Sequence, residues 1–148
     1  MQVKEILRVK GGALFSIRPQ DALAAAVERM AESDVGSLVV LDGSRLVGML
    51  TFREVMQVLK RQGGKLDGLT VSDVMVLDPV TVPQEMEAND LRRLMIDKHS
   101  RYLPVIDGEQ LLGVISFLDV AKAVLEEQSL ENRMLKSYIK NWPAEDAA

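Results

Sequence analysis

The chain has 148 residues, enough for one compact domain or for two small units that share a core, and its hydrophobic fraction of 47% is typical of a globular protein. A net charge of -4 with mixed signs excludes the clustered basic surface of most nucleic-acid-binding proteins, and the lack of cysteine excludes disulfides and thiolate metal sites. Charges interrupt the N-terminal stretch MQVKEILRVKGG, and no apolar run approaches the roughly 18 residues of a membrane span, so we expect a cytoplasmic protein with no nucleic-acid or membrane partner.

The sequence contains an internal duplication. Residues 45–56 (RLVGMLTFREVM) and 110–121 (QLLGVISFLDVA) share one order of apolar run, glycine, hydroxyl residue and acid. The two copies lie 65 positions apart, and their alignment needs no gap from Ser16 and Thr81 onward. A register held over this length indicates duplication rather than chance.

Each copy has the pattern of a β-α-β-β-α unit. A short apolar element precedes a proline- and acid-rich helix start, and apolar residues then recur at helical spacing. Two continuous apolar strands joined by a two-residue turn follow, and the second runs directly into another helix. In the first copy the expected elements are a strand at 15–17, a helix carrying Leu23, Ala26, Val27 and Met30, strands at 37–42 and 45–51, and a helix from Phe52. In the second copy they are a strand at 80–82, a helix carrying Ala88, Leu91, Leu94 and Met95, strands at 102–107 and 110–116, and a helix from Phe117.

The expected fold class is α/β (α+β), with two pseudo-symmetric repeats packed as one module and a helix after them. A single unit of about 55 residues is near the lower limit for a self-sufficient core, so the two should pack together around a cleft. The expected domains are repeat 1 at 3–62, a glycine-rich linker at 63–70, repeat 2 at 71–128, and a C-terminal amphipathic helix with a frayed tail at 129–148.

The motif that points to chemistry is Gly-x-x-Thr/Ser-x-x-acid, which occurs once in each repeat. Its residues are Gly48, Thr51 and Glu54 in the first repeat and Gly113, Ser116 and Asp119 in the second. A hydroxyl at a helix N-terminus suits a phosphate, an acid one turn later can accept both hydroxyls of a ribose, and the glycine lets another group approach the strand closely. The same spacing fits a capping box, in which acid and hydroxyl satisfy only backbone amides, and both roles can hold at one site.

These features resemble a tandem pair of CBS (cystathionine-β-synthase) domains over residues 3 to about 128. The resemblance is carried by the duplicated motif, by LPVID at 103–107, and by VKEIL at 3–7, which matches VSDVM at 71–75 if the first copy has three extra residues near 10–12. It implies a stand-alone regulatory module of bacterial type that binds an adenosine nucleotide in the cleft and signals to a partner by a conformational change. AMP is the ligand expected first, with ADP, ATP, NAD and S-adenosylmethionine as alternatives and no metal required.

The resemblance also implies two composite pockets, in which the acid of one repeat faces the strands of the other. Pocket A is expected to consist of Ser16, Gly36, Ser37, Leu38, Ser116 and Asp119. Pocket B is expected to consist of Thr51, Arg53, Glu54, Thr81, Arg101, Tyr102, Leu103 and Pro104.

The two expected pockets differ in how well they match the family. Asp119 is the usual ribose acceptor, whereas Glu54 is one methylene longer than the expected aspartate. That length would shift the sugar, favour a different ligand or leave pocket B empty. Arg53 and Arg101 are candidate phosphate partners of pocket B, although Arg53 in a first helical turn also fits a solvated role. Tyr102 fits a half-buried strand residue or a ring that stacks on the base.

Nothing in the sequence suggests catalysis. There is no cysteine, and His99, the only histidine, has no evident partner, so no nucleophile–base pair and no metal site is expected. We therefore expect a regulatory protein rather than an enzyme, with an unknown effector protein as its partner. The alternative is a ligand-independent dimeric interaction scaffold in which the motifs only cap helices.

The C-terminal stretch predicts an amphipathic helix that ends before Pro143. Its apolar residues at helical spacing are Leu130, Met134, Leu135, Tyr138, Ile139 and Trp142. This side of the helix is expected either to pack on its own module or to dock on the second subunit of a homodimer, the assembly that the resemblance implies.

Overall fold

The computed structural model describes residues 1–141 and consists of two small sheets with helices on their outer faces. The helices are α1 (Val3–Lys10), α2 (Leu23–Ser33), α3 (Phe52–Arg61), α4 (Ala88–Asp97) and α5 (Phe117–Lys140), with one short 3-10 helix, η1 (Val71–Asp73). The strands are β1 (Ser16–Ile17), β2 (Ser37–Asp42), β3 (Arg45–Thr51), β4 (Val76–Leu77), β5 (Val82–Pro83), β6 (Tyr102–Asp107) and β7 (Gln110–Ser116). None of the helices in this described part combines the length and apolar composition needed to cross a bilayer.

The two repeats have the same strand pairing, which confirms the predicted duplication. In each, a short strand lies parallel to the first strand of an antiparallel hairpin, giving the orders β1-β2-β3-β4 and β5-β6-β7. The hairpins are in equivalent register, since Ser37 pairs with Thr51 and Tyr102 with Ser116. The start of each hairpin therefore lies beside the corner where its second strand turns into a helix.

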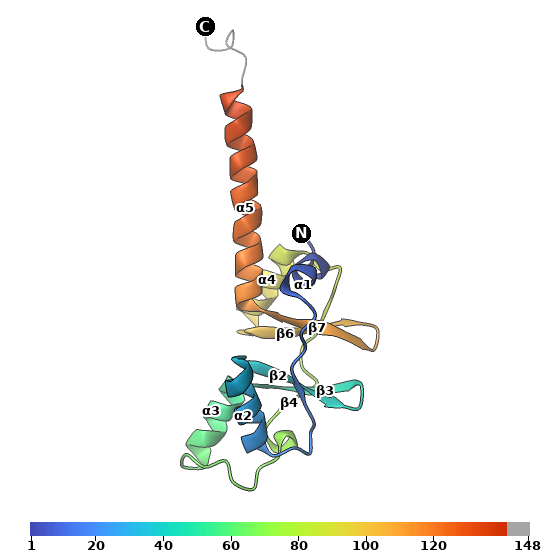
Figure 1. Cartoon of the computed structure of the whole chain (residues 1–148), viewed down its shortest axis with the longest axis vertical. Helices are drawn as coiled ribbons and strands as arrows, with labels where there is room; N and C mark the ends of the chain where they lie inside the picture. The colour runs from blue at the N-terminus through green and yellow to red at the C-terminus, as the bar shows by residue number, and fades with distance from the viewer. Residues whose placement is uncertain (142–148) are drawn as a thin grey trace.

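The two sheets face each other, so each hairpin is covered on both sides (Figure 1). In β2, Leu38 and Val40 point into the core of their own repeat, and Val39 between them is also fully buried. Because side chains alternate along a strand, Val39 and its cross-strand neighbour Met49 point toward the second sheet. This two-sided burial explains why the strands read as continuous apolar runs.

The segment that precedes each repeat docks on the other repeat. At the N-terminus, Val3 N donates to Met86 O at 2.9 Å, and Val3 and Ile6 are buried in the core of the second repeat. In the middle of the chain, Val71 N donates to Asp21 O at 2.9 Å, and Val71 is buried in the core of the first repeat. The two docking arrangements are pseudo-symmetric, and each core is completed by chain from outside its own β-α-β-β-α unit.

The motif glycines make room for these exchanged segments. A β-carbon on Gly48 would lie 2.7 Å from the sulfur of Met75 and 2.8 Å from the carbonyl oxygen of Val76, and one on Gly113 would lie 3.0 Å from Leu7. The close approach expected at both glycines is thus made by the last residue of each leading segment.

The C-terminal helix is not a separate element. The sequence suggested a helix from Phe117 and another from Ser129, but α5 runs without a break from Phe117 to Lys140 and projects well beyond the two sheets (Figure 1). The division at residue 128 disappears because no glycine or proline interrupts the segment, so the first helix simply continues. Trp142 lies outside the described residues.

Docking of α1 on the second repeat gives the first testable prediction. Ile6→Ala should lower the free energy of unfolding by about 2–4 kcal/mol, because Ile6 is only 4% exposed within the second core. Val9→Ala, in the same helix at 87% exposure, should change it by less than about 0.5 kcal/mol. Urea denaturation measures both, and equal effects for the two variants would contradict the docking.

Candidate functional site

Two strand-to-helix corners lie at the centre of the molecule, one from each repeat. In the first, the amide of Phe52 donates to Gly36 O at 3.1 Å, and in the second the amide of Phe117 donates to Arg101 O at 2.8 Å. These bonds join the start of each hairpin to the start of the helix that follows it. Each corner is therefore a fixed backbone frame around a helix N-terminus.

Both motifs form capping boxes. At the first corner, the backbone amide and the hydroxyl of Thr51 each donate to Glu54 Oε1 at 2.8 Å. At the second corner, the amide of Ser116 donates to Asp119 Oδ2 at 2.9 Å, and the amide of Asp119 donates to Ser116 Oγ at 3.1 Å. The capping interpretation is thus confirmed at both corners, and it leaves a second role for each carboxylate open.

A pocket of about 760 Å³ lies at the second corner, within the range typical of small-molecule sites. It is bounded by the segment after α1, the loop between α2 and β2, the start of β6 and the start of α5. Its lining residues are Lys10, Gly11, Ala13, Leu14, Phe15, Asp34, Val35, Gly36, Ser37, Arg101, Tyr102, Val114, Ser116, Phe117 and Leu118. Residues of both repeats contribute, as expected for a composite site.

The two corners differ in the size of the side chains at two equivalent positions. Gly36 and Ser37 lie beside the pocket, whereas their counterparts 65 positions later are Arg101 and Tyr102. The Arg101 guanidinium lies 5.4 Å from the centre of the Phe52 ring, and the Tyr102 ring meets Phe52 edge-on at 6.3 Å. Large side chains thus occupy the space beside the first corner, and small ones leave space beside the second.

Gly36 is also required by the packing around it. A β-carbon at this position would lie 2.0 Å from the Tyr102 hydroxyl oxygen and 2.9 Å from the Phe52 ring. Any larger residue would force the tyrosine to move. Gly36 therefore fixes how closely the two repeats approach at this edge of the pocket.

Lys10 covers the acid of the second corner. Its ammonium lies 2.7 Å from Asp119 Oδ2 and 2.8 Å from Val114 O, and Lys10 lines the pocket whereas Asp119 does not. Burial by itself would raise the pKa of the Asp119 carboxyl, but hydrogen bonds from Lys10 and Ser116 outweigh burial and leave that pKa below its usual value. The ammonium of Lys10 therefore lies between the Asp119 carboxylate and the pocket.

The predicted pocket A residues take four different positions. Gly36, Ser37 and Ser116 line the pocket, Leu38 is fully buried in the sheet beneath it, and Asp119 lies behind Lys10. Ser16 lies in β1 outside the lining, where its carbonyl accepts a hydrogen bond from Arg29.

The predicted pocket B residues divide between the two corners. Arg101 and Tyr102 line the same pocket as Gly36. The others lie outside that lining: Thr51, Arg53 and Glu54 at the start of α3, Thr81 just before β5, and Leu103 and Pro104 buried in β6.

The sequence did not indicate the segment after α1 as part of the site. Lys10, Gly11, Ala13, Leu14 and Phe15 all line the pocket, and this segment begins near residues 10–12, where the first copy carries three extra residues. That break in the register was the available signal, since an insertion in one copy marks a place where the repeats differ. The sequence could not show that the insertion faces Asp119.

A profile of the CBS domain matches residues 3–61 and 71–126. The chain belongs to the CBS domain family. It is 29% identical over 147 residues to the CBS domain-containing protein CBSX3, mitochondrial, of Arabidopsis thaliana, covering 93% of this chain and 71% of that protein.

Two solved structures of CBS proteins share the fold. The CBS-domain containing protein ATU1752 from Agrobacterium tumefaciens has a TM-score of 0.79 at 27% identity, covering 83% of this chain and 98% of that one. Arabidopsis CBSX2 in complex with AMP has a TM-score of 0.71 at 26% identity, covering 86% of this chain and 98% of that one. The shared fold therefore accounts for the two sheets and the helices packed on them in the described residues.

The contact between Lys10 and Asp119 leads to the second prediction. Lys10→Met should raise the pKa of Asp119, because burial then acts on a carboxylate that has lost a charged donor. A group with a lowered pKa stabilises the fold above its unfolded pKa and loses that contribution as the pH falls through its folded pKa, so the variant should show a smaller loss of stability in acid. Carboxyl ¹³C titration by NMR measures the pKa directly.

Lys4→Met is the matched control for this titration, since Lys4 is exposed on the same helix. It should leave the pKa of Asp119 unchanged. An unchanged pKa in the Lys10 variant as well would show that the two groups are not paired in solution.

Proposed function

We propose that this CBS pair binds an adenine nucleotide, AMP foremost, in the pocket at the second corner, and that occupancy is signalled to a separate effector protein. The observation that carries the proposal is the composite pocket itself, which joins Gly36 and Ser37 of one repeat to the N-terminus of α5 in the other. Support also comes from CBSX2, which shares the fold and was solved with AMP.

The groups around the pocket fit the parts of a nucleotide. Leu14, Phe15 and Val35 supply apolar walls for a flat base. Ser116 at the N-terminus of α5 and the Arg101 guanidinium, whose backbone belongs to the same corner, are suited to a phosphate. The apolar walls belong to the first repeat and the phosphate partners to the second, so one ligand would connect both repeats.

Ribose binding in this pocket would require Lys10 to move. The Asp119 carboxylate accepts from Lys10, and a sugar that donates two hydroxyls needs both carboxylate oxygens. Once displaced, the ammonium of Lys10 remains on the pocket wall, where it is suited to a phosphate. Lys10 would then exchange one anionic partner for another, which keeps the energetic cost of its movement small.

Movement of Lys10 supplies a route from ligand to conformation. Lys10 ends α1, which is docked on the second repeat, and residues 11–15 cross from there to β1 of the first repeat. A nucleotide that binds better with Lys10 displaced would favour a different position of this crossing segment, because a ligand shifts an equilibrium only by its difference in affinity for the two states.

A ligand-independent interaction scaffold is the second candidate function. The observation that favours it is that Glu54 and Asp119 already satisfy the N-termini of their own helices. If they have no other role, no adenine nucleotide should stabilise the protein, and the fold should act only by presenting its surfaces to other proteins.

The third prediction tests the two functions. Asp119→Asn should weaken AMP binding by about 10–100-fold, since it removes a charged hydrogen-bond acceptor from the ribose while keeping the size of the side chain. Isothermal titration measures the affinity, and thermal shift with AMP, ADP, ATP, NAD and S-adenosylmethionine measures stabilisation by mass action.

Glu54→Gln is the matched control at the first corner, and it should leave AMP affinity within about twofold of the wild type, because Glu54 is bonded to Thr51 outside the pocket, whereas Asp119 is bonded to the lining residues Lys10 and Ser116. Equal losses in both variants would place the nucleotide elsewhere. No stabilisation of the wild-type protein by any of the five compounds would favour the scaffold.

A further inference from the structure

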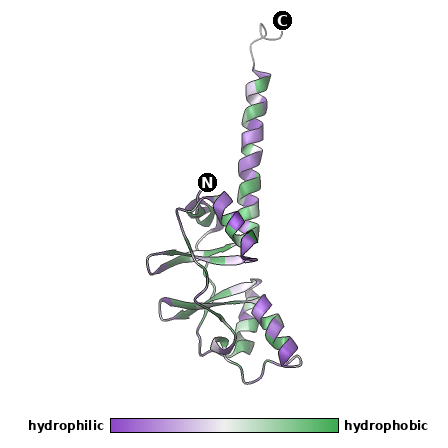
Figure 2. Cartoon of the chain, turned by 180° about the vertical axis from the view of Figure 1, so that it is seen from behind, coloured by the Kyte–Doolittle hydropathy of each residue, from purple (hydrophilic) through white to green (hydrophobic). Residues whose placement is uncertain are grey.

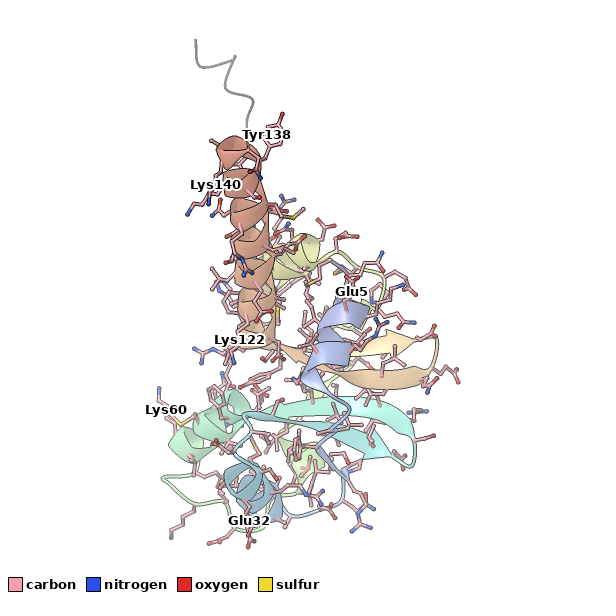
Figure 3. All side chains as sticks on the ribbon, turned by 45° about the horizontal axis from the view of Figure 1, so that its top comes forward. Glu5, Glu32, Lys60, Lys122, Tyr138 and Lys140 are labelled. Atoms are coloured by element: carbon pink, nitrogen blue, oxygen red, sulfur yellow. The ribbon has the colours of Figure 1, made fainter. Side chains whose placement is uncertain are left out.

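Lys10 has two partners in the protein, and both belong to the second repeat. Its ammonium lies 2.7 Å from Asp119 Oδ2 and 2.8 Å from the carbonyl oxygen of Val114. The side chains of Lys10 and Asp119 are 33% and 22% exposed, so water screens this ion pair only in part. Figure 3 shows α1 running from the turn with Glu5 toward the first turns of α5, where Lys122 lies. A ligand that binds the Asp119 carboxylate through both oxygens must therefore displace a cation that is held at two points.

The carbonyl of Val114 is open to Lys10 because the second sheet has one strand fewer than the first. In the first sheet, β4 pairs with β3 at Gly48 and Met49. Their counterparts 65 positions later are Gly113 and Val114 in β7, and no strand of the described residues pairs with β7 on that side. The ammonium of Lys10 bonds this edge instead. The chain passes between the repeats beside the two sheets (Figure 2), and residues 11–15 make the crossing that follows Lys10.

The first corner has no comparable cation. Glu54 accepts from the amide and the hydroxyl of Thr51, and among residues 1–141 no lysine or arginine forms an ion pair with it. Both corners nevertheless have complete capping boxes, so capping of α5 does not require Lys10. The contact between Lys10 and Asp119 belongs to the corner that has the pocket, which points to a role in what the pocket binds.

The charged groups at the pocket are two cations and two carboxylates. Lys10, Arg101 and Asp34 line it, and Asp119 lies behind Lys10. A ribose is neutral, so its hydroxyls can take over the Asp119 carboxylate but leave the displaced ammonium without an anion. A 5′-phosphate on that ribose supplies an anion nearby, and the flexible four-carbon stem of lysine lets the ammonium turn toward it.

We propose that Lys10 makes this pocket selective for phosphorylated nucleosides over free nucleosides. With AMP, the ammonium exchanges the Asp119 carboxylate for the phosphate. With adenosine, the ammonium either loses its anionic partner or stays on Asp119 and keeps the ribose from it. This inference rests on the proposed nucleotide site, and it adds that the phosphate is what opens Asp119 to the sugar.

Isothermal titration of AMP and of adenosine into the wild type and Lys10→Met tests the selectivity. The wild type should bind AMP at least about tenfold more tightly than adenosine. Lys10→Met should bind adenosine about three- to fivefold more tightly than the wild type does, because the sugar no longer has to displace an ion pair. The same variant should bind AMP more weakly, because the phosphate has lost a charged partner. A purely structural role for Lys10 would instead weaken the binding of both compounds.

Two further variants serve as controls. Lys10→Arg should keep the preference for AMP, since the guanidinium retains the charge, and Lys4→Met, exposed on the same helix, should leave both affinities unchanged. If AMP binds the wild type but is preferred over adenosine to the same degree in Lys10→Met, the selectivity proposal is wrong and the nucleotide site stands. If the wild type binds neither compound, the nucleotide site is wrong, and the selectivity with it.

Inorganic phosphate provides a separate test, because it supplies the anion without the rest of the nucleotide. Saturating phosphate should tighten the binding of adenosine to the wild type by about threefold or more, since the free ion takes over the displaced ammonium. Potassium chloride at the same ionic strength should not tighten it, and phosphate should have no effect on adenosine binding in Lys10→Met. An adenosine affinity that phosphate leaves unchanged in the wild type, or raises equally in the variant, would overturn the exchange at Lys10.

Discussion

The exchange of leading segments is the constraint on which the rest of this structure depends. Each β-α-β-β-α unit has too little apolar surface to form a stable core alone, and each is completed by a helix or turn that precedes the other unit. The two repeats therefore form one structural unit rather than two independent domains joined by a linker. The chain must cross between them at residues 11–15, and this crossing segment forms a wall of the pocket.

A duplicated fold gives two equivalent corners, and the site arises from where the copies differ. The backbone bonds and the capping boxes are nearly the same at both. At the start of each hairpin the copies differ at two positions, with Gly36 and Ser37 in one against the larger Arg101 and Tyr102 in the other, and the small pair lies beside the pocket. A third difference lies at the end of α1, where Lys10 contacts Asp119 of the second corner.

Periodicity predicted the hairpins, the helices on each repeat and the corners, because these depend on which side chains are buried along a continuous stretch. It could not predict the exchange, since apolar spacing shows that Val3 and Ile6 are buried but not in which core. The contact between Lys10 and Asp119 joins residues 109 positions apart and has no local signal. Tyr102 at the start of β6 and Phe52 at the start of α3 likewise meet only through the packing of one repeat on the other. The sequence therefore predicted the repeats and both motifs, but it did not predict that Lys10 would bind the carboxylate of Asp119.

The docking of α1 has a consequence for how the protein is made. The ribosome releases residues 1–10 first, but their binding surface, built from residues 82–124, is the last part of the body to emerge. Residues 15–77 contain every member of the first core and are released before the second core is complete. Residues 1–10 must therefore wait, with Val3 and Ile6 in water, until residues 82–124 have been released. The alternating lysines, arginine and glutamate of residues 1–10 keep this waiting segment soluble.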